Sequence, residues 1–242
     1  MTVITGGAGL VGRACVDALA ARGHACVALD PASARGGVVS AVETIRCDVS
    51  SEREVARAVE RVRKRYGRID AFVHSPGVQP AGFGADLVDY DLTVWKRVLD
   101  VHVTGAMLVS RALVPLMARR RAGSIVFLGS IYSVVAPTFS LYRDGVPAPP
   151  LVYSASKAAL VGMARWIAVR YARVGIRCNV VSPGGIDESR WPRGGFKKKY
   201  LGQVPLGRAV NVADVARAIV YALEAEHLSG HNLVLDGAWT SV

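Results

Sequence analysis

The sequence is poor in cysteine, with four in 242 residues. They lie far apart inside apolar segments, and none forms a C-x-x-C pair or a cluster with metal-ligand spacing. This pattern argues against a disulfide framework and against a cysteine-held metal site. We therefore expect reduced cysteines in the hydrophobic core and no bound metal. The four are Cys15, Cys26, Cys47 and Cys178.

Long hydrophobic runs and targeting signals are also missing. No stretch reaches the roughly 20 consecutive apolar residues that span a bilayer. The N-terminal segment MTVITGGAGLVG has no basic region followed by an apolar core and a cleavage site, so it does not resemble a signal peptide. We expect a cytoplasmic protein that has no membrane partner.

Acidic residues are few relative to basic ones, with 19 Asp and Glu against 30 Lys and Arg and a net charge of +11. Such an excess is compatible with nucleic-acid binding. The basic residues, however, are scattered along helix-like segments such as 53–65, and the chain has no zinc finger, basic zipper or stacking-aromatic motif. These observations favour a solvated, arginine-rich surface and no nucleic-acid partner.

Strand-like and helix-like segments alternate along the chain, and 51% of the residues are hydrophobic. The alternation predicts an α/β fold, a single-domain, Rossmann-like, doubly wound parallel sheet of about seven strands with helices on both faces. Without a repeat or a linker, residues 1–242 are expected to form one domain. Strand-like segments are 2–5, 25–30, 43–47, 70–74, 124–129, 176–182 and 232–236; helix-like segments are 10–22, 51–66, 86–120, 153–173 and 211–226.

A glycine-rich turn, TGGAGLVG at 5–12, joins the first predicted strand to the first predicted helix. Gly6, Gly9 and Gly12 recur at every third position. Glycines at such a junction permit a tight turn and a close approach of the backbone to a pyrophosphate, and the helix N-terminus offers free N–H groups to the phosphates. The turn therefore predicts a dinucleotide site.

The end of the second predicted strand indicates which dinucleotide binds. A carboxylate at Asp30 can accept hydrogen bonds from both hydroxyls of an adenosine ribose and would repel a 2′-phosphate. This favours NAD(H) over NADP(H), although Arg35 lies five residues on and could tolerate the phosphate. Asp48, after the third strand, is placed either to meet the adenine or to cap the helix that begins near Ser51.

The segment LVYSASKAAL places Tyr153 and Lys157 four residues apart. On a helix these positions share a face. The pair is either the polar edge of a buried helix or an acid beside its activating cation. Taken alone, the pair favours the polar edge of a buried helix, because a tyrosine four residues before a lysine is common on amphipathic helices.

With both motifs considered together, the chain resembles the short-chain dehydrogenase/reductase family over essentially its whole length. The resemblance rests on TGGAGLVG, CDV at 47–49, GS at 129–130, YSASK at 153–157, NVVSPGG at 179–185 and LVLDGAW at 233–239. It implies a catalytic trio of Ser130, Tyr153 and Lys157. It also implies that NAD(H) is held by Gly6, Gly9, Leu10, Val11, Gly12, Asp30, Asp48, Val49, Ser75, Gly77, Tyr153, Lys157, Pro183, Gly184 and Ile186.

The implied chemistry is hydride transfer between the cofactor and a carbonyl or alcohol. A reduced carbonyl needs a proton at once, and a free tyrosine has a pKa near 10. The Lys157 ammonium and the positive charge of oxidised nicotinamide both favour phenolate and should move the pKa of Tyr153 toward neutrality. Ser130 would polarise the carbonyl oxygen, and Lys157 would also hold the nicotinamide ribose.

The sequence departs from the family pattern at several positions. HSPG replaces the usual N-N-A-G and brings in His74. His102, in HVTG, stands where the family has a catalytic asparagine that holds a proton-relay water. A neutral imidazole could hold that water, so we include His102 among the catalytic candidates. Its alternative is a histidine that only packs. Glu188 replaces a cofactor-binding threonine.

Two loops are expected to form the substrate side, at about 130–152 and 184–208, because loops at the carboxyl ends of the strands form the site. The first is longer than the family norm. Its sequence, GSIYSVVAPTFSLY, weakly resembles the corresponding segment of reductases from bacterial surface-sugar or secondary-metabolite pathways. The second is either a solvated basic loop or a site for an anionic substrate. Its cations are Arg190, Arg193, Lys197, Lys198 and Lys199.

The function expected from these residues is an NAD(H)-dependent ketone reductase or alcohol dehydrogenase acting on a small molecule. Two alternatives stay open, an NAD-dependent sugar epimerase or dehydratase with the same trio, and a non-catalytic NAD-binding regulator. The resemblance also implies a homodimer or homotetramer, with apolar residues of segments 86–120 and 153–173 in the interface.

Overall fold

Seven short runs form the strands of one parallel sheet in the computed structural model, which describes residues 1–31, 40–143, 146–186, 191–192 and 195–242. The strand order is β3-β2-β1-β4-β5-β6-β7, and every neighbouring pair is parallel. The predicted sheet is therefore confirmed. The strands are β1 (Thr2–Thr5), β2 (Cys26–Asp30), β3 (Glu43–Arg46), β4 (Ala71–His74), β5 (Gly123–Leu128), β6 (Ile176–Pro183) and β7 (Asn232–Leu235).

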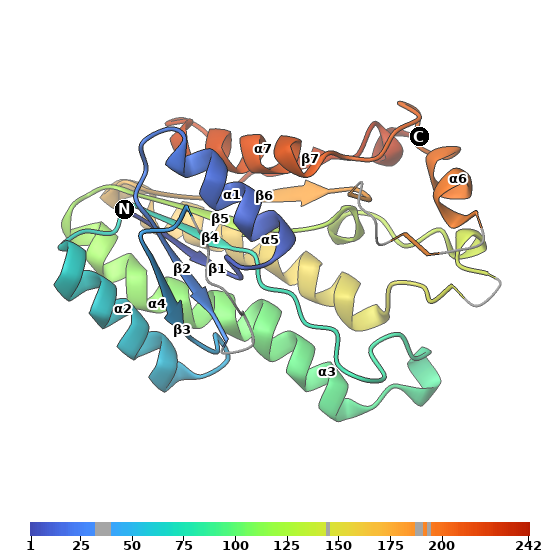
Figure 1. Ribbon diagram of the computed structural model, residues 1–242, viewed down its shortest axis with the longest axis horizontal. Helices are drawn as coiled ribbons and strands as arrows, with labels where there is room; N and C mark the ends of the chain where they lie inside the picture. The colour runs from blue at the N-terminus through green and yellow to red at the C-terminus, as the bar shows by residue number, and fades with distance from the viewer. Residues whose placement is uncertain (32–39, 144–145, 187–190, 193–194) are drawn as a thin grey trace.

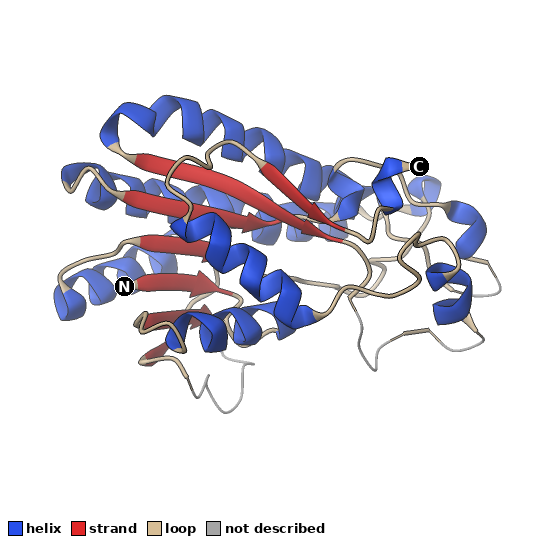
Figure 2. Cartoon of the chain, turned by 90° about the horizontal axis from the view of Figure 1, so that it is seen from above, coloured by secondary structure: helices blue, strands red, loops and turns tan. Residues whose placement is uncertain are grey.

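Helices cover both faces of this sheet (Figures 1 and 2). One apolar core lies between the sheet and helices α1 (Leu10–Ala20) and α7 (Val212–Glu224). The other lies between the sheet and helices α2 (Glu52–Tyr66), α4 (Gly105–Arg119) and α5 (Leu151–Tyr171). The four cysteines are buried and free, as the sequence predicts.

The expected helix at 86–120 is wrong in its continuity. A short 3₁₀ turn (Leu87–Asp89) comes first, then α3 (Leu92–Leu99), a π-helical turn (Asp100–Thr104) and α4. A π-helical turn inserts one extra residue and often marks a functional site. Here it carries His102 toward β4, because the ring of His74 hydrogen-bonds to the backbone oxygen of His102 at 3.1 Å.

By length and composition, the helical stretch Leu92–Arg119 could cross a membrane, which differs from the expectation that no such stretch exists. Its mean hydropathy is 1.5, and 56% of its most apolar window is buried in the protein. A core helix of a soluble protein passes the same test, so the stretch is weak evidence for a membrane span.

The strand order places the site. From β1 the chain runs outward to β2 and β3 and then returns to β4 on the other side of β1, so the crossovers after β1 and β4 leave in opposite directions. Thr5 and His74 lie side by side at the carboxyl ends of these strands. Ligands of open α/β sheets bind in the crevice at such a reversal.

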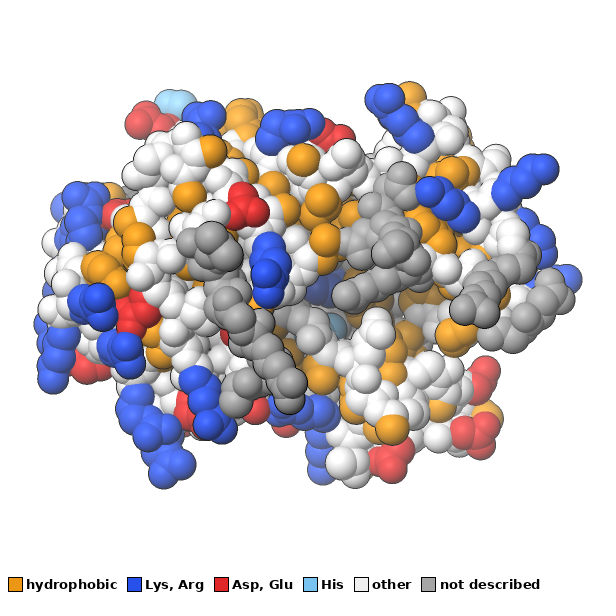
Figure 3. Space-filling view, viewed as in Figure 1, with side chains coloured by type: hydrophobic (Ala, Val, Ile, Leu, Met, Phe, Trp, Pro, Cys, Tyr) orange, Lys and Arg blue, Asp and Glu red, His pale blue; other side chains and the backbone are white. Residues whose placement is uncertain are grey.

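Lys and Arg side chains are spread around the face shown in Figure 3 and do not gather into one patch there. Apolar side chains are visible near the hollow in the middle of this face. The basic composition thus appears on this face as scattered, solvated charges.

Candidate active site

A cavity of about 570 Å³ opens at the reversal point between β1 and β4. Seven of the predicted cofactor residues line it, together with Ala8, Arg13, Pro76 and Val101. The seven are Gly6, Gly9, Asp30, Asp48, Val49, Ser75 and Gly77. The predicted adenosine end of the site therefore comes together around one hollow.

The glycine turn is shaped by close backbone contacts. Gly6 has φ +67°, a left-handed conformation, and a Cβ there would lie 2.6 Å from Cα of Pro76. A Cβ on Gly12 would lie 2.0 Å from the carbonyl oxygen of Gly6. Glycine at both positions lets the turn fold tightly and start α1 beside the cavity. This cradle fits the pyrophosphate of a dinucleotide.

Asp30 is held in place by the same turn. Its carboxylate accepts a hydrogen bond from the backbone N–H of Ala8 at 2.7 Å. Burial raises the pKa of Asp30, while the N–H groups of Ala8 and Gly7 and the nearby Arg13 oppose that rise. The carboxylate lines the cavity and can accept further hydrogen bonds, as the ribose assignment requires.

Asp48 lines the cavity, and the alternative that it caps α2 is wrong. Ser51 is the N-cap, because its hydroxyl accepts the N–H of Glu54. The Asp48 carboxylate instead accepts hydrogen bonds from Ser50 and from Arg97 at 3.1 Å. Burial alone would raise the pKa of Asp48, but these donors together hold it below the usual range.

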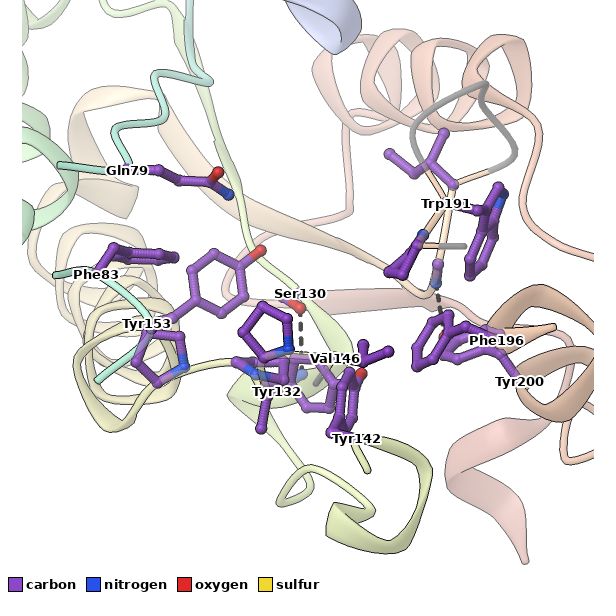
Figure 4. A pocket seen from close by; sticks show the side chains of 18 of the residues that line it. Gln79, Phe83, Ser130, Tyr132, Tyr142, Val146, Tyr153, Trp191, Phe196 and Tyr200 are labelled. Atoms are coloured by element: carbon purple, nitrogen blue, oxygen red, sulfur yellow. Dashed lines mark hydrogen bonds between the residues drawn. The ribbon is translucent and has the colours of Figure 1, made fainter. Parts of the chain in front are cut away.

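A second cavity, of about 710 Å³, contains the predicted reacting groups (Figure 4). Ser130 follows β5 and Tyr153 lies in the first turn of α5, and both line this cavity. The predicted cofactor residues Leu10, Gly184 and Ile186 line it as well. Val11, Gly12 and Pro183 are buried, and they line neither cavity.

Lys157 lies one helical turn beyond Tyr153 and is buried, with 5% of its surface exposed. Its Nζ donates a hydrogen bond to the carbonyl oxygen of Leu128 at 2.8 Å and lies 5.6 Å from the centre of the Tyr153 ring. Burial lowers the pKa of Lys157 to about 8. The lysine and the tyrosine are therefore a neighbouring pair, as the spacing on one helix face predicts.

The pKa of Tyr153 differs from the expected shift in the chain without cofactor. Burial raises the pKa of the phenol above 10, and a hydrogen bond with Ser130 only partly opposes this rise. The downward shift expected from Lys157 is therefore not found in the free chain, because desolvation penalises the phenolate. The protonated phenol is the form needed to donate a proton to a reduced carbonyl.

His74 is a buried histidine with a defined tautomer. Its Nε2 faces the carbonyl oxygen of His102, which only accepts, so Nε2 carries the proton. Its Nδ1 then accepts from the hydroxyl of Thr5 at 2.9 Å. Burial and the positive charge of Lys157 lower the pKa of His74 to about 3, so the ring is neutral near pH 7.

His102 is oriented by Ser156 on α5. The Ser156 hydroxyl donates to the carbonyl oxygen of Tyr153 at 2.8 Å, so it accepts from Nδ1–H of His102 at 2.9 Å. Nε2 of His102 is then an acceptor, and it is buried without a partner among the described residues. Burial and then the charge of Lys157 lower the pKa of His102 to about 2.

A protein-family model described as "Enoyl-(Acyl carrier protein) reductase" matches residues 7–240. The chain is 32% identical to the 3-oxoacyl-[acyl-carrier-protein] reductase of Homo sapiens over 240 residues, which cover 97% of this chain and 95% of that one. The chain belongs to the short-chain dehydrogenase/reductase family. It is therefore an NAD(P)-dependent oxidoreductase of that family.

Other relatives of the family span the same length. A cis-4-hydroxycyclohexanecarboxylate dehydrogenase of Sinomonas cyclohexanicum is 31% identical and covers 100% of this chain and 97% of its own. A short chain dehydrogenase of Leptospira borgpetersenii, solved with bound NAD+, superposes with a TM-score of 0.88 at 26% identity, over 99% of this chain and 92% of that one. A gluconate 5-dehydrogenase of Burkholderia cenocepacia, solved with NADP, has TM-score 0.87 at 23% identity, covering 100% and 95%, and so shows the fold alone.

The first residue of α4 is a glycine that packs closely against Val49. Gly105 ends HVTG, and a Cβ there would lie 2.8 Å from a methyl group of Val49 in the cofactor cavity.

The residues Arg35, Glu188, Arg190 and Arg193 lie outside the described part of the chain.

The loop at about 130–152, expected on the substrate side, supplies Tyr132 and Tyr142 to the second cavity, but the other rings of this cavity were not predicted from the sequence. Helix α6 (Phe196–Leu201) turns Phe196 and Tyr200 inward, and Phe83 approaches from the segment after β4 (Figure 4). The four-residue spacing of Phe196 and Tyr200 was a usable signal, because it places both rings on one helix face. The lysines between them indicated a basic loop instead.

Proposed function

We propose that this chain is an NAD(H)-dependent alcohol dehydrogenase or ketone reductase that interconverts a secondary alcohol and a ketone. The observation that carries the proposal is the meeting of Ser130 and Tyr153 in one cavity with Lys157 buried behind the tyrosine. The cavity with the glycine turn and Asp30 supports binding of the dinucleotide next to it.

In the proposed reaction, the cofactor and each of the three residues would have a separate role. Bound NAD(H) would supply or accept the hydride. Tyr153 would donate its phenolic proton to the carbonyl oxygen in reduction and take it back in oxidation. Ser130 would hydrogen-bond to the same oxygen and orient it. Lys157 would stabilise the phenolate that Tyr153 becomes and would hold the nicotinamide ribose.

The direct test is a screen of ketones with NADH and of secondary alcohols with NAD+, followed by the absorbance of NADH. Product analysis of the converted substrates distinguishes a redox reaction from epimerisation or dehydration. Net oxidation of NADH with matching alcohol formation supports the proposal, whereas a product at the oxidation level of its substrate contradicts it.

The cofactor preference depends on Asp30. NADH should exceed NADPH in kcat/KM by about tenfold or more, because a carboxylate opposes a 2′-phosphate. Asp30→Ala should narrow that ratio. Asp17→Ala is the matched control, because it removes the same charge from an exposed position on α1 outside the cavity. Equal kcat/KM values for the two cofactors in the unmutated protein would contradict the assignment.

His102 is proposed to hold the water through which Lys157 exchanges protons with solvent. Its Nε2 is an acceptor near the lysine, and with a pKa of about 2 the ring does not itself ionise during turnover. His102→Ala should lower kcat by about tenfold or more, part of the usual contribution of proton transfer. His102→Asn should restore much of it, because an amide can also hold water.

A relay role predicts that His102→Ala loses kcat at an unchanged melting temperature, whereas a packing role predicts that the melting temperature falls as well. The three proteins are compared in kcat against pH, melting temperature and NADH dissociation constant. We expect no ionisation from His102 between pH 5 and 9, because burial keeps its pKa far below that range. Full activity of His102→Ala with unchanged stability would leave no role for the relay.

We propose that the chain forms a homodimer or homotetramer through α4 and α5. Apolar side chains of these helices face solvent: Met107 is 40% exposed, Trp166 61% and Val169 81%. Trp166→Glu should shift the sedimentation coefficient toward a monomer, because a buried charge disrupts an apolar interface. Val88→Glu, in another exposed apolar position, is the control. A single 25.7 kDa species of unmutated protein at micromolar concentration would rule the assembly out.

A further inference from the structure

The described residues that line the cavity at Tyr153 and Ser130 include no aspartate, glutamate, lysine, arginine or histidine. Its walls are mainly aromatic rings and prolines. The rings belong to Phe83, Tyr132, Tyr142, Trp191, Phe196 and Tyr200. Figure 4 shows Phe83 near Tyr153 on one side and Trp191, Phe196 and Tyr200 on the other.

Helix α6 separates its charges from its rings. Phe196 and Tyr200 are 5% and 4% exposed and line the cavity. Lys198 and Lys199 between them are exposed, and Nζ of Lys197 lies 6.0 Å from the centre of the Trp191 ring. None of these lysines lines the cavity. The lysines of this helix therefore lie outside the lining of the cavity, whereas its two aromatic rings are part of it.

The aromatic walls are held by one another. The Tyr200 hydroxyl accepts the N–H of Gly185 at 2.8 Å, and its ring stacks on Trp239 at 4.7 Å between centres. The hydroxyls of Tyr132 and Tyr142 hydrogen-bond to each other at 2.6 Å. These contacts hold the rings in a fixed arrangement, so the cavity receives ring surfaces in defined positions.

We propose that the substrate is a neutral ketone or secondary alcohol carrying a hydrophobic ring, and that a carboxylate or phosphate on the substrate is rejected. This inference rests on the proposed oxidoreductase function and names its substrate class. An ionised group would lose its hydration in this cavity without gaining a cation from the described lining residues, whereas a ring would gain contact with aromatic walls. Among the lining side chains, Gln79 offers an amide at the edge opposite Tyr132 (Figure 4).

The test uses two ketones with the same ring, the neutral ester methyl 4-acetylbenzoate and the anionic 4-acetylbenzoate, with NADH. We expect kcat/KM to be about 100-fold higher for the ester, because the carboxylate is desolvated without a partner. Acetoacetyl-coenzyme A represents an anionic carrier-bound substrate and should be poor as well. Preference for the carboxylate or for the coenzyme A thioester overturns the proposal.

Two variants on α6 locate the effect in the cavity wall. Phe196→Ala should raise KM for the ester about tenfold, because the substrate ring loses an aromatic contact. Phe196→Leu keeps most of the side-chain volume and should raise this KM by less. Lys198→Ala is the control on the same helix and should leave kcat/KM unchanged for both ketones. If Lys198→Ala lowers kcat/KM for 4-acetylbenzoate, the lysine does bind the substrate and the proposal is overturned.

Calorimetric binding of the two ketones to the NADH complex separates the two levels of inference. Binding of the ester over the acid without turnover of any ketone supports the neutral ring site and contradicts the reductase function. Turnover of acyclic anionic ketones with no binding of either aromatic ketone supports the reductase function and contradicts the ring site.

Discussion

Tyr153→Phe is expected to lower kcat for ketone reduction by about 10²–10⁴-fold, the usual contribution of a positioned acid. The dissociation constant of NADH should change by less than about twofold, because the lost hydroxyl acts on the reacting oxygen in the transition state. The measurement is kcat and KM from NADH absorbance together with a fluorescence titration of NADH. Tyr221→Phe, an exposed tyrosine on α7, removes a hydroxyl away from the cavity and is the control.

The pH dependence gives a second readout for the same residue. Burial raises the pKa of Tyr153 above 10 in the free chain, so the protonated acid is present throughout the neutral range. Reduction should therefore stay level with pH until the phenol ionises, while alcohol oxidation, which needs the phenolate, should rise with pH. Tyr153→Phe should abolish that rise. Retention of activity within a few-fold, with the rise intact, would remove Tyr153 from the mechanism.

Gly12→Ala is expected to weaken NADH binding by about tenfold or more. The new Cβ would lie 2.0 Å from the carbonyl oxygen of Gly6, so the turn and the start of α1 must move apart. Overpacking of this kind costs about 1–3 kcal/mol in stability. The measurements are the NADH dissociation constant and the free energy of unfolding in denaturant.

Gly162→Ala is the matched control for the glycine turn. It is the same substitution in a helix, on α5, where a Cβ would meet nothing within 4 Å. Alanine should there stabilise the helix slightly, by up to about 1 kcal/mol, and leave NADH binding unchanged. Equal behaviour of the two variants would show that the close contact at Gly12 has no role in the cofactor site.

Local pattern was sufficient for much of this protein. The seven strands and the glycine turn were predicted from the sequence because a strand, a helix and a tight turn each depend on neighbouring residues. Tyr153 and Lys157 were predicted as a pair for the same reason, since residues four apart share a helix face. Family resemblance then supplied Ser130, which lies on another element.

Tertiary structure decided what depends on distant neighbours. Burial among other elements reversed the expected shift in the pKa of Tyr153, because desolvation depends on packing that no spacing shows. The π-helical turn and the contact of His74 with the oxygen of His102 link β4 to the 100–104 segment.

The division between ring and charge on α6 is likewise a property of the fold. A run of three lysines between Phe196 and Tyr200 is ambiguous in sequence, because a helix face has no inside until a core exists beside it. The sequence by itself determined the oxidoreductase family, and its resemblance to that family indicated Ser130, Tyr153 and Lys157 as the candidate trio. Only the packed structure decided which side chains line the cavity at Ser130 and Tyr153, because that depends on which face of each element is covered.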